Sequence, residues 1–293
     1  MKKNLSARLW FLSSMVIFGT IGIFVRSIPI PSALLALCRA FIALVFLGGV
    51  LLLGKTRLRF SELKGELVWL LLSGAAMAIN WILLFEAYRY TSVSLATLSY
   101  YFAPVLVTLL SPLLFRENMT PRKWICFVGS TAGLLLMTGI GDVGQGSRHW
   151  LGILLGLGAA CFYATVMLLN KKIRGVSGIP RTFLQFFSAT AVLLLYVPFA
   201  GGVSPLAALR PSAWLMLLVV GLVHTGITYC LYFSSMKELP GQEIAILSYC
   251  DPLVAVLLSV FLLHETMTIP QLLGGAMILG FTCWNELDGG KKK

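Results

Sequence analysis

The residue with the sharpest chemical signal is Asp251, which lies inside the apolar run 243–263. An ionised carboxylate near the middle of a bilayer costs at least a few kcal/mol unless it is paired or hydrated. We therefore expect Asp251 to carry a coupling proton or to bind a cationic group. The alternative is a structural carboxyl that pairs with a helix neighbour or stays protonated.

Arg39 lies about six residues into the apolar run 33–53, which is roughly 9 Å along a helix. Three interpretations remain open for this cation. Its long side chain can reach back to the membrane interface. It can instead attract a carboxylate or phosphate, or pair with an acid such as Glu86 in the run 66–88.

A third set consists of aromatic and weakly polar side chains within the apolar runs. As a group they predict a pocket suited to an amphipathic solute. Taken singly, each tyrosine is better explained by packing and by hydrogen bonds to neighbouring helices. His224 either changes protonation near neutral pH or is a neutral histidine between helices. The set comprises Asn80, Trp81, Tyr100, Tyr163, His224, Tyr229 and Tyr249.

Pro104 and Pro252 each stand within an apolar run. A proline inside a helix removes one backbone hydrogen bond and leaves a carbonyl that neighbouring groups or water must satisfy. These two positions are candidate hinges, and a static kink is the simpler alternative.

The sequence contains no convincing motif for catalysis, metal binding or cofactor binding. The string Gly49, Gly54, Lys55 and Thr56 fits a phosphate loop, but the residues between the glycines lie in an apolar run rather than an exposed turn. HExxH, GxSxG and paired aspartates within the membrane are absent, and the six cysteines lack metal-site or disulfide spacing. We therefore predict no enzyme, no cofactor and no metal.

The elements that position these residues follow from composition. The chain of 293 residues is 58% hydrophobic and 12% charged, whereas soluble domains are about 25% charged. That much apolar surface excludes a disordered chain. A membrane helix needs about 20 apolar residues, and the fold class is thus an all-α integral membrane protein. Ten spans are predicted, at 9–26, 33–53, 66–88, 92–115, 123–140, 150–170, 181–200, 212–235, 243–263 and 269–285.

The net charge of +12 sets topology rather than partners. Lysine and arginine form short clusters between apolar runs, which disfavours nucleic acid. With the N-terminus inside, most of the 23 basic residues fall on inner segments, as the positive-inside rule requires. We predict a multi-pass protein of the cell membrane with both termini cytoplasmic, and we expect the basic start, Met1–Arg8, to lead into an uncleaved first span.

An internal repeat divides the chain. Leu98-Ser99-Tyr100 recurs as Leu247-Ser248-Tyr249, and the pattern that runs from Pro104 to Thr120 recurs from Pro252 to Thr268. Because each half holds five spans, an odd number, the second half must be inverted. Inverted halves around a midplane site are a common transporter design. The expected divisions are 1–141, an outer linker 142–149, and 150–293.

This arrangement resembles the EamA-type branch of the drug/metabolite transporter superfamily. The resemblance rests on Pro104–Glu117 with Met119-Thr120, on Asp251–Glu265 with Met267-Thr268 and Gly274-Gly275, and on Arg39. It implies a ten-helix permease that exports a small amphipathic metabolite, such as an amino acid, through a cavity lined by spans 1, 3, 4, 6, 8 and 9. It leaves the solute, a coupling ion and the oligomeric state open, and it leaves the direction open as well, because proteins of this kind are sometimes associated with uptake. An intramembrane enzyme and a passive channel or scaffold are the competing classes.

Overall fold

The computed structural model describes residues 2–54, 65–115, 118–137, 147–176, 178–236, 238–239 and 241–289. Glu117 and residues 142–146 of the predicted linker lie outside this part of the chain. The helices are α1 (Lys2–Ser27), α2 (Ser32–Leu53), α3 (Leu67–Tyr90), α4 (Val93–Tyr100), α5 (Ala103–Phe115), α6 (Pro121–Met137), α7 (Ser147–Lys172), α8 (Gly178–Tyr196), η2 (Val197–Ala200), η3 (Ser204–Ala208), α9 (Pro211–Leu218), η4 (Val219–Ile227), α10 (Thr228–Met236), α11 (Gly241–Ser248), α12 (Cys250–Leu262) and α13 (Ile269–Gly289).

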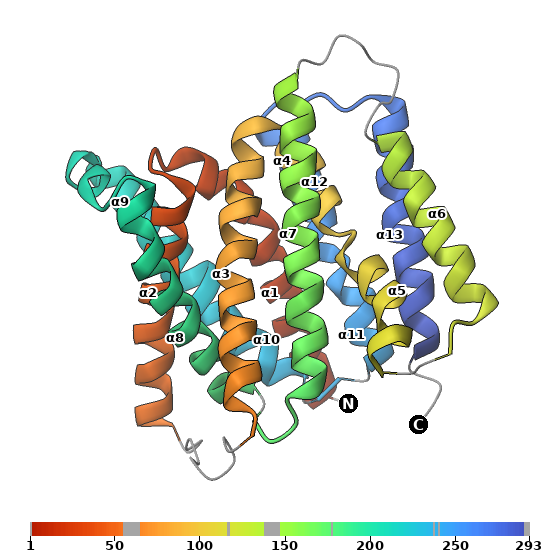
Figure 1. Cartoon of the computed structure of the whole chain (residues 1–293), viewed down its shortest axis with the longest axis horizontal. Helices are drawn as coiled ribbons and strands as arrows, with labels where there is room; N and C mark the ends of the chain where they lie inside the picture. The colour runs from red at the N-terminus through yellow and green to blue at the C-terminus, as the bar shows by residue number, and fades with distance from the viewer. Residues whose placement is uncertain are drawn as a thin grey trace.

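The helices cross the molecule in alternating directions (Figure 1). We call the end where α1 begins and α13 ends the lower end, as Figure 1 is drawn, and the opposite end the upper end. The start of α3 and the final turns of α2, α7 and α10 also lie at the lower end. This alternation is what short connections between membrane-length helices produce.

Seven helical stretches are long and apolar enough to cross a membrane, and Cys250–Leu262 is a shorter apolar helix. The seven are Leu5–Ser27, Ser32–Leu53, Leu67–Tyr90, Val93–Phe115, His149–Lys172, Gly178–Ala200 and Pro211–Met236. The fold is therefore that of a helical, multi-pass membrane protein. By length and composition, the described residues do not reach the ten spans expected from the sequence.

Two of the expected continuous spans are broken. The run 92–115 is divided into α4 and α5 at Tyr101 and Phe102, and the run 243–263 is divided into α11 and α12 at Tyr249. Pro104 and Pro252 consequently stand in the first turn of a new helix, where a backbone N–H has no helical partner to lose. The prolines mark helix starts, and their role as hinges stays a prediction.

The helices pack in a defined set of pairs. The helix α3 lies against α7 and α8, α1 lies against α12 and α10, and α2 lies against α8 and η4. The helices α6 and α13 form a separate tight pair, since a Cβ atom on Gly133 would lie 2.7 Å from the carbonyl oxygen of Gly274. Such close backbone approach is typical of helix pairs in membranes, where small residues line the interface.

The segment η4 is a π-helix, a wider turn than an α-helix and one that is frequent at functional sites. The hydroxyl of Thr225 donates to the carbonyl of Val220 at 2.7 Å, and that of Thr228 donates to the carbonyl of Val223 at 2.7 Å. These side chains bond carbonyls five residues earlier and so support the wide turn. The turn also brings Thr225 against α2.

Candidate functional site

Two adjacent cavities lie among the helices, with volumes of about 520 Å³ and about 130 Å³. Side chains from α1, α3, α4, α7, α10 and α12 form their common wall. The residues that line both cavities are Phe18, Trp81, Tyr100, Tyr101, Tyr163, Tyr229 and Asp251. The wall is mostly aromatic with a few polar tips, which is the composition of a small-molecule site.

The larger cavity extends to the lower end of the bundle. Its lining includes Asn170 near the end of α7, Arg181 at the start of α8, Met236 at the end of α10 and Ile244 in the first turn of α11. These positions cluster at the end of the molecule where α1 begins. The chamber is therefore approached from below.

Close helix contacts seal the other side. A Cβ atom on Gly19 would lie 2.6 Å from the carbonyl oxygen of Asp251 and 2.7 Å from Cβ of Val254. One turn further up, a Cβ atom on Gly22 would lie 2.5 Å from Cγ1 of Val93. Because glycine has no side chain, α1 comes into direct contact with α12 at the wall of the smaller cavity and with α4 one turn further along.

A carboxylate ties the same three helices together at the upper end. Glu265 forms an ion pair with Arg26 at the end of α1 and accepts a hydrogen bond from the hydroxyl of Ser259 on α12. It also accepts the backbone N–H of Val93, at the start of α4, at 2.9 Å. The first N–H groups of a helix have no helical acceptor, so a carboxylate there is favourable. This ionic and hydrogen-bonded cluster therefore holds the ends of α1, α4 and α12 together at the upper end.

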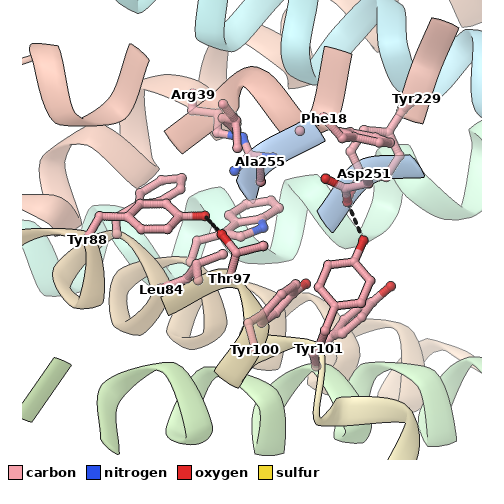
Figure 2. A pocket seen from close by; sticks show the side chains of 15 residues that line it. Phe18, Arg39, Leu84, Tyr88, Thr97, Tyr100, Tyr101, Tyr229, Asp251 and Ala255 are labelled. Carbon is pink, nitrogen blue, oxygen red and sulfur yellow. Dashed lines mark hydrogen bonds between the residues drawn. The ribbon is translucent and has the colours of Figure 1, made fainter. Parts of the chain in front are cut away.

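Asp251 faces both cavities from the first turn of α12 (Figure 2). The hydroxyl of Tyr101 donates to Oδ2 of Asp251 at 2.5 Å. Among the residues that the structure describes, no lysine or arginine lies within 4 Å of this carboxylate. The break before α12 brings a helix N-terminus to the chamber, and its dipole favours a negative charge there. The carboxylate therefore faces the cavity with no cation from the described residues beside it.

Arg39 lines the smaller cavity and is 4% exposed. Its Nε donates to the hydroxyl of Thr225 at 2.7 Å, and its guanidinium carbon lies 4.8 Å from the ring centre of Trp81 and 5.4 Å from that of Phe85. Within the described ranges no carboxylate comes within 4 Å of it. The aromatic rings offer favourable cation–π contacts, yet none of the described residues supplies a counter-ion.

Figure 2 shows Arg39 and Asp251 apart from each other, with Ala255 between them in this view and aromatic side chains around them. Glu86 does not serve as the partner of Arg39. Its Oε2 accepts a hydrogen bond from Ser32 at 2.5 Å and lies 3.5 Å from Nη1 of Arg89. The pocket thus presents a buried cation and a carboxylate that are each open to an occupant.

The structure brings together most of the aromatic set expected from the sequence. Tyr100 and Tyr163 stack with ring centres 4.9 Å apart, and Tyr229 lies edge-on to Phe18 at 5.3 Å. The larger cavity is lined by Asn80, Trp81, Tyr100, Tyr163, Tyr229, Tyr249 and Pro104. The amide of Asn80 also donates to the carbonyl of Ala159 at 2.6 Å and so joins α3 to α7.

His224 lies apart from this set. It is 2% exposed and lines neither cavity, and its Nε2 lies 2.7 Å from the hydroxyl of Thr20. Its ring centre is 4.7 Å from that of Phe24. The histidine joins η4 to α1 within the packed interior. Pro252 is also buried outside the lining.

Several lining residues escaped the sequence analysis. Tyr101 has no repeated counterpart, because Cys250 occupies the matching position, so a search guided by the repeat passes over it. Arg181 is basic and close to an inner segment, which made it look like a topology signal alone. The usable signal for Tyr101 was the proline three residues later, which predicts that the helix stops and turns at this tyrosine.

Comparisons with known proteins agree with this geometry. A model described as the EamA-like transporter family matches residues 5–139 and again residues 150–285. The chain is 33% identical to the uncharacterized transporter YxxF of Bacillus subtilis over 94% of the chain and 88% of that protein. It is 32% identical to an uncharacterized transporter of Archaeoglobus fulgidus over 68% of the chain and 70% of that protein. One crystal structure aligns with a TM-score of 0.63 and 20% identity, over 94% of this chain and 95% of the other.

Proposed function

Because the chain belongs to the EamA-like transporter family, we propose that it is a secondary transporter which exports a small amphipathic metabolite, such as an amino acid or a related solute, by alternating access. The observation that carries this proposal is the central aromatic chamber, which extends to the lower end while α1, α4 and α12 close the upper end. A chamber open to one side at a time is what alternating access requires, whereas a passive channel needs a continuous path.

The proposed architecture is ten spans in two inverted halves. The broken helices α4–α5 and α11–α12 would each form one span, and α6 and α13 would complete the count. The family model matches the chain twice, and the breaks fall at corresponding places in the two matches. The packing pairs also correspond between the two halves. In the repeat α7 corresponds to α1, and α4–α5 corresponds to α11–α12; α1 packs on α12, and α7 packs on α4 and α5. The pairs α2–α8 and α6–α13 map onto themselves.

In this proposal the lower end is cytoplasmic and the protein lies in the cell membrane. The basic residues gather on the connections and tails assigned to that end, as the positive-inside rule requires. The solute then enters the chamber from the cytoplasm and leaves at the upper end. Outward direction rests on the family resemblance.

The two buried charges receive separate roles. Asp251 binds a cationic group of the solute or carries a coupling proton, and Arg39 binds an anionic group. Both side chains line the 130 Å³ pocket, and the described residues supply neither with a counter-ion within 4 Å. An opposite charge from the solute would relieve the cost of keeping each one out of water.

Counterflow in proteoliposomes tests the proposed function. A transporter exchanges labelled solute faster when unlabelled solute is present on the far side, and this exchange saturates. Candidate solutes come from a thermal-shift screen of amino acids, amines, sugars and nucleosides, because a ligand at 100 times its dissociation constant adds about 2.7 kcal/mol of apparent stability. Flux without acceleration by the far-side solute would indicate a channel instead, and chemical conversion of the solute would indicate an enzyme.

Glu265→Gln is expected to weaken the upper closure. Glutamine removes the charge that holds Arg26 and the N–H of Val93, and charged hydrogen bonds are worth roughly 1.5–3 kcal/mol each. A loss of about 1–3 kcal/mol would shift the balance toward an upper-open arrangement roughly 5- to 150-fold.

The measurement is labelling of Ala255→Cys, which lines the smaller cavity, by a membrane-impermeant thiol reagent added to intact cells. The six native cysteines are replaced by serine in this background. Labelling is expected to accelerate in the Glu265→Gln variant and to stay slow in Glu238→Gln, which alters an exposed acid at the lower end. Equal labelling rates in the two variants would show that Glu265 does not hold the upper end closed.

A further inference from the structure

We propose that Arg181 and the side-chain amide of Asn170 form an anion-binding subsite at the lower mouth of the chamber, where the carboxylate or phosphate of an arriving solute binds before it reaches Asp251. This subsite rests on the proposed function and deepens it, because it gives the anionic group of the solute a first binding site at the lower mouth. It is separate from the charged pair of the smaller cavity.

The position of Arg181 supports this role. It lies in the first turn of α8, is half-buried, and lines the 520 Å³ cavity but not the 130 Å³ pocket. Arg39 shows the opposite pattern, since it lines only the smaller pocket. Asp251 lines both. A solute coming from below therefore meets Arg181 first, Asp251 next and Arg39 last.

Arg181 forms no ion pair with a carboxylate in the described part of the chain. Its Nη1 donates to the backbone carbonyl of Asn170 at 3.4 Å, and no described acid lies within 4 Å of its guanidinium. The nearby acid Glu66 is occupied elsewhere. Its carboxylate accepts the backbone N–H of Gly175 at 2.9 Å and that of Arg174 at 2.8 Å, which hold the pKa of Glu66 below its usual range.

The side-chain amides of Gln185 and Asn170 also line the cavity that Arg181 lines, and hydrogen bonds hold them in place. Gln185 is 4% exposed, and its Nε2 donates to the hydroxyl of Ser73 at 2.6 Å and to Oδ1 of Asn170 at 2.7 Å. With Oδ1 engaged, Asn170 keeps its two Nδ2 donors, which bond to no acceptor among the described residues. Asn170, Arg181 and Gln185 all line the larger cavity.

These donors match one class of ligand. A guanidinium supplies a planar fork of N–H donors that suits carboxylate and phosphate, and an adjacent amide adds a further donor. The neighbouring wall is apolar, with Met77, Val166 and Met167. The geometry suits an anionic group attached to an apolar body. A lipid headgroup phosphate has the same anionic chemistry, so the experiment must separate the two sources.

The test uses phenylacetate and its neutral isostere phenylacetamide as probes on the purified full-length protein. Dissociation constants are obtained from thermal-shift titrations in detergent without added lipid. The wild type is expected to bind phenylacetate about tenfold more tightly than phenylacetamide, since charge-assisted bonds are roughly twice as strong as neutral ones. Arg181→Gln is expected to lower that ratio severalfold, and Arg181→Lys to restore part of it.

The matched control is Arg174→Gln, which removes an exposed cation of the same end that does not line the cavity. Its probe ratio is expected to equal that of the wild type. An unchanged ratio in Arg181→Gln would overturn the subsite, and so would an equal fall in both variants, because the latter reflects the general positive field.

A lipid arm distinguishes the source of the anion. The same titrations are run in nanodiscs of phosphatidylcholine alone and of phosphatidylcholine with phosphatidylglycerol. A solute subsite keeps the phenylacetate preference in both, whereas a preference lost only with the anionic lipid would assign Arg181 to a headgroup and overturn the proposal. Absence of counterflow for every solute would defeat the proposed function but would leave the probe ratio intact, so the two failures are distinguishable.

Discussion

Asp251→Asn is expected to reduce solute counterflow at least tenfold and to remove its dependence on pH. The carboxylate lines both cavities and accepts the hydroxyl of Tyr101, and no described cation neutralises it. Asparagine keeps the size but loses the charge and the exchangeable proton. A lost charged hydrogen bond of roughly 1.5–3 kcal/mol corresponds to about a 10- to 150-fold effect.

The measurement is counterflow in proteoliposomes between pH 5.5 and 8.5. This range extends about one pH unit or more to either side of neutrality, where a coupling group must exchange its proton. Tyr101→Phe is the companion variant, because it removes the partner hydroxyl and leaves the carboxylate. It should retain a pH-dependent rate. If Asp251→Asn transported at the wild-type rate with the wild-type pH profile, Asp251 would be a structural carboxyl.

Gly19→Ala is expected to hold the transporter open at the upper end and to lower counterflow by about tenfold or more. The new methyl group would lie 2.6 Å from the carbonyl oxygen of Asp251 and 2.7 Å from Cβ of Val254, so α1 must move away from α12. Overpacking of this kind costs roughly 1–3 kcal/mol. That cost falls on the lower-open arrangement, in which the two helices touch.

Impermeant labelling of Ala255→Cys from outside the cell, as for Glu265→Gln, measures the shift. Gly49→Ala is the matched control, since it makes the same change inside a helix at a site where nothing lies within 4 Å of the new atom. The control should label and transport like the parent protein. Slow labelling together with normal counterflow in Gly19→Ala would show that this contact does not gate the chamber.

The broad class of the fold was accessible from the sequence because it depends on composition and on the length of apolar runs. Those quantities identify helices that need lipid, and the family resemblance, which the family model confirms, followed from the repeated pattern around Pro104 and Pro252. The helix breaks were less accessible. Hydropathy averages over a run and does not register where the backbone stops, so each broken run read as one helix.

The candidate site was predicted in part, for a similar reason. Repetition in sequence pointed to Tyr100 and Tyr249, which line the larger cavity. Tyr101 binds the key carboxylate but is not repeated. His224 seemed central from its position along a span, yet rotation about the helix axis, which hydropathy in so apolar a segment does not encode, places it against α1 and away from the cavities.

Partner choice for buried charges was beyond the sequence. Both Thr225 and Glu86 stand in spans next to that of Arg39, and only the wide turn of the π-helix decides in favour of the threonine. Likewise, the engagement of Glu66 by two backbone N–H groups arises from the connection between α7 and α8. Such pairings depend on three-dimensional register between helices far apart along the chain.

The packing of α1 against α12 at Gly19 has a thermodynamic consequence. Gly19 packs on the carbonyl of the same residue whose side chain faces the cavities, so the proposed seal and the proposed ligand-binding carboxylate share one helical turn. A solute that binds this carboxylate with unequal affinity in the lower-open and upper-open arrangements must shift the equilibrium between them by that difference in binding free energy. Solute binding and the contact between α1 and α12 are then linked through a single peptide unit. This link offers a simple means to suppress leakage of ions or solutes when the transporter is empty.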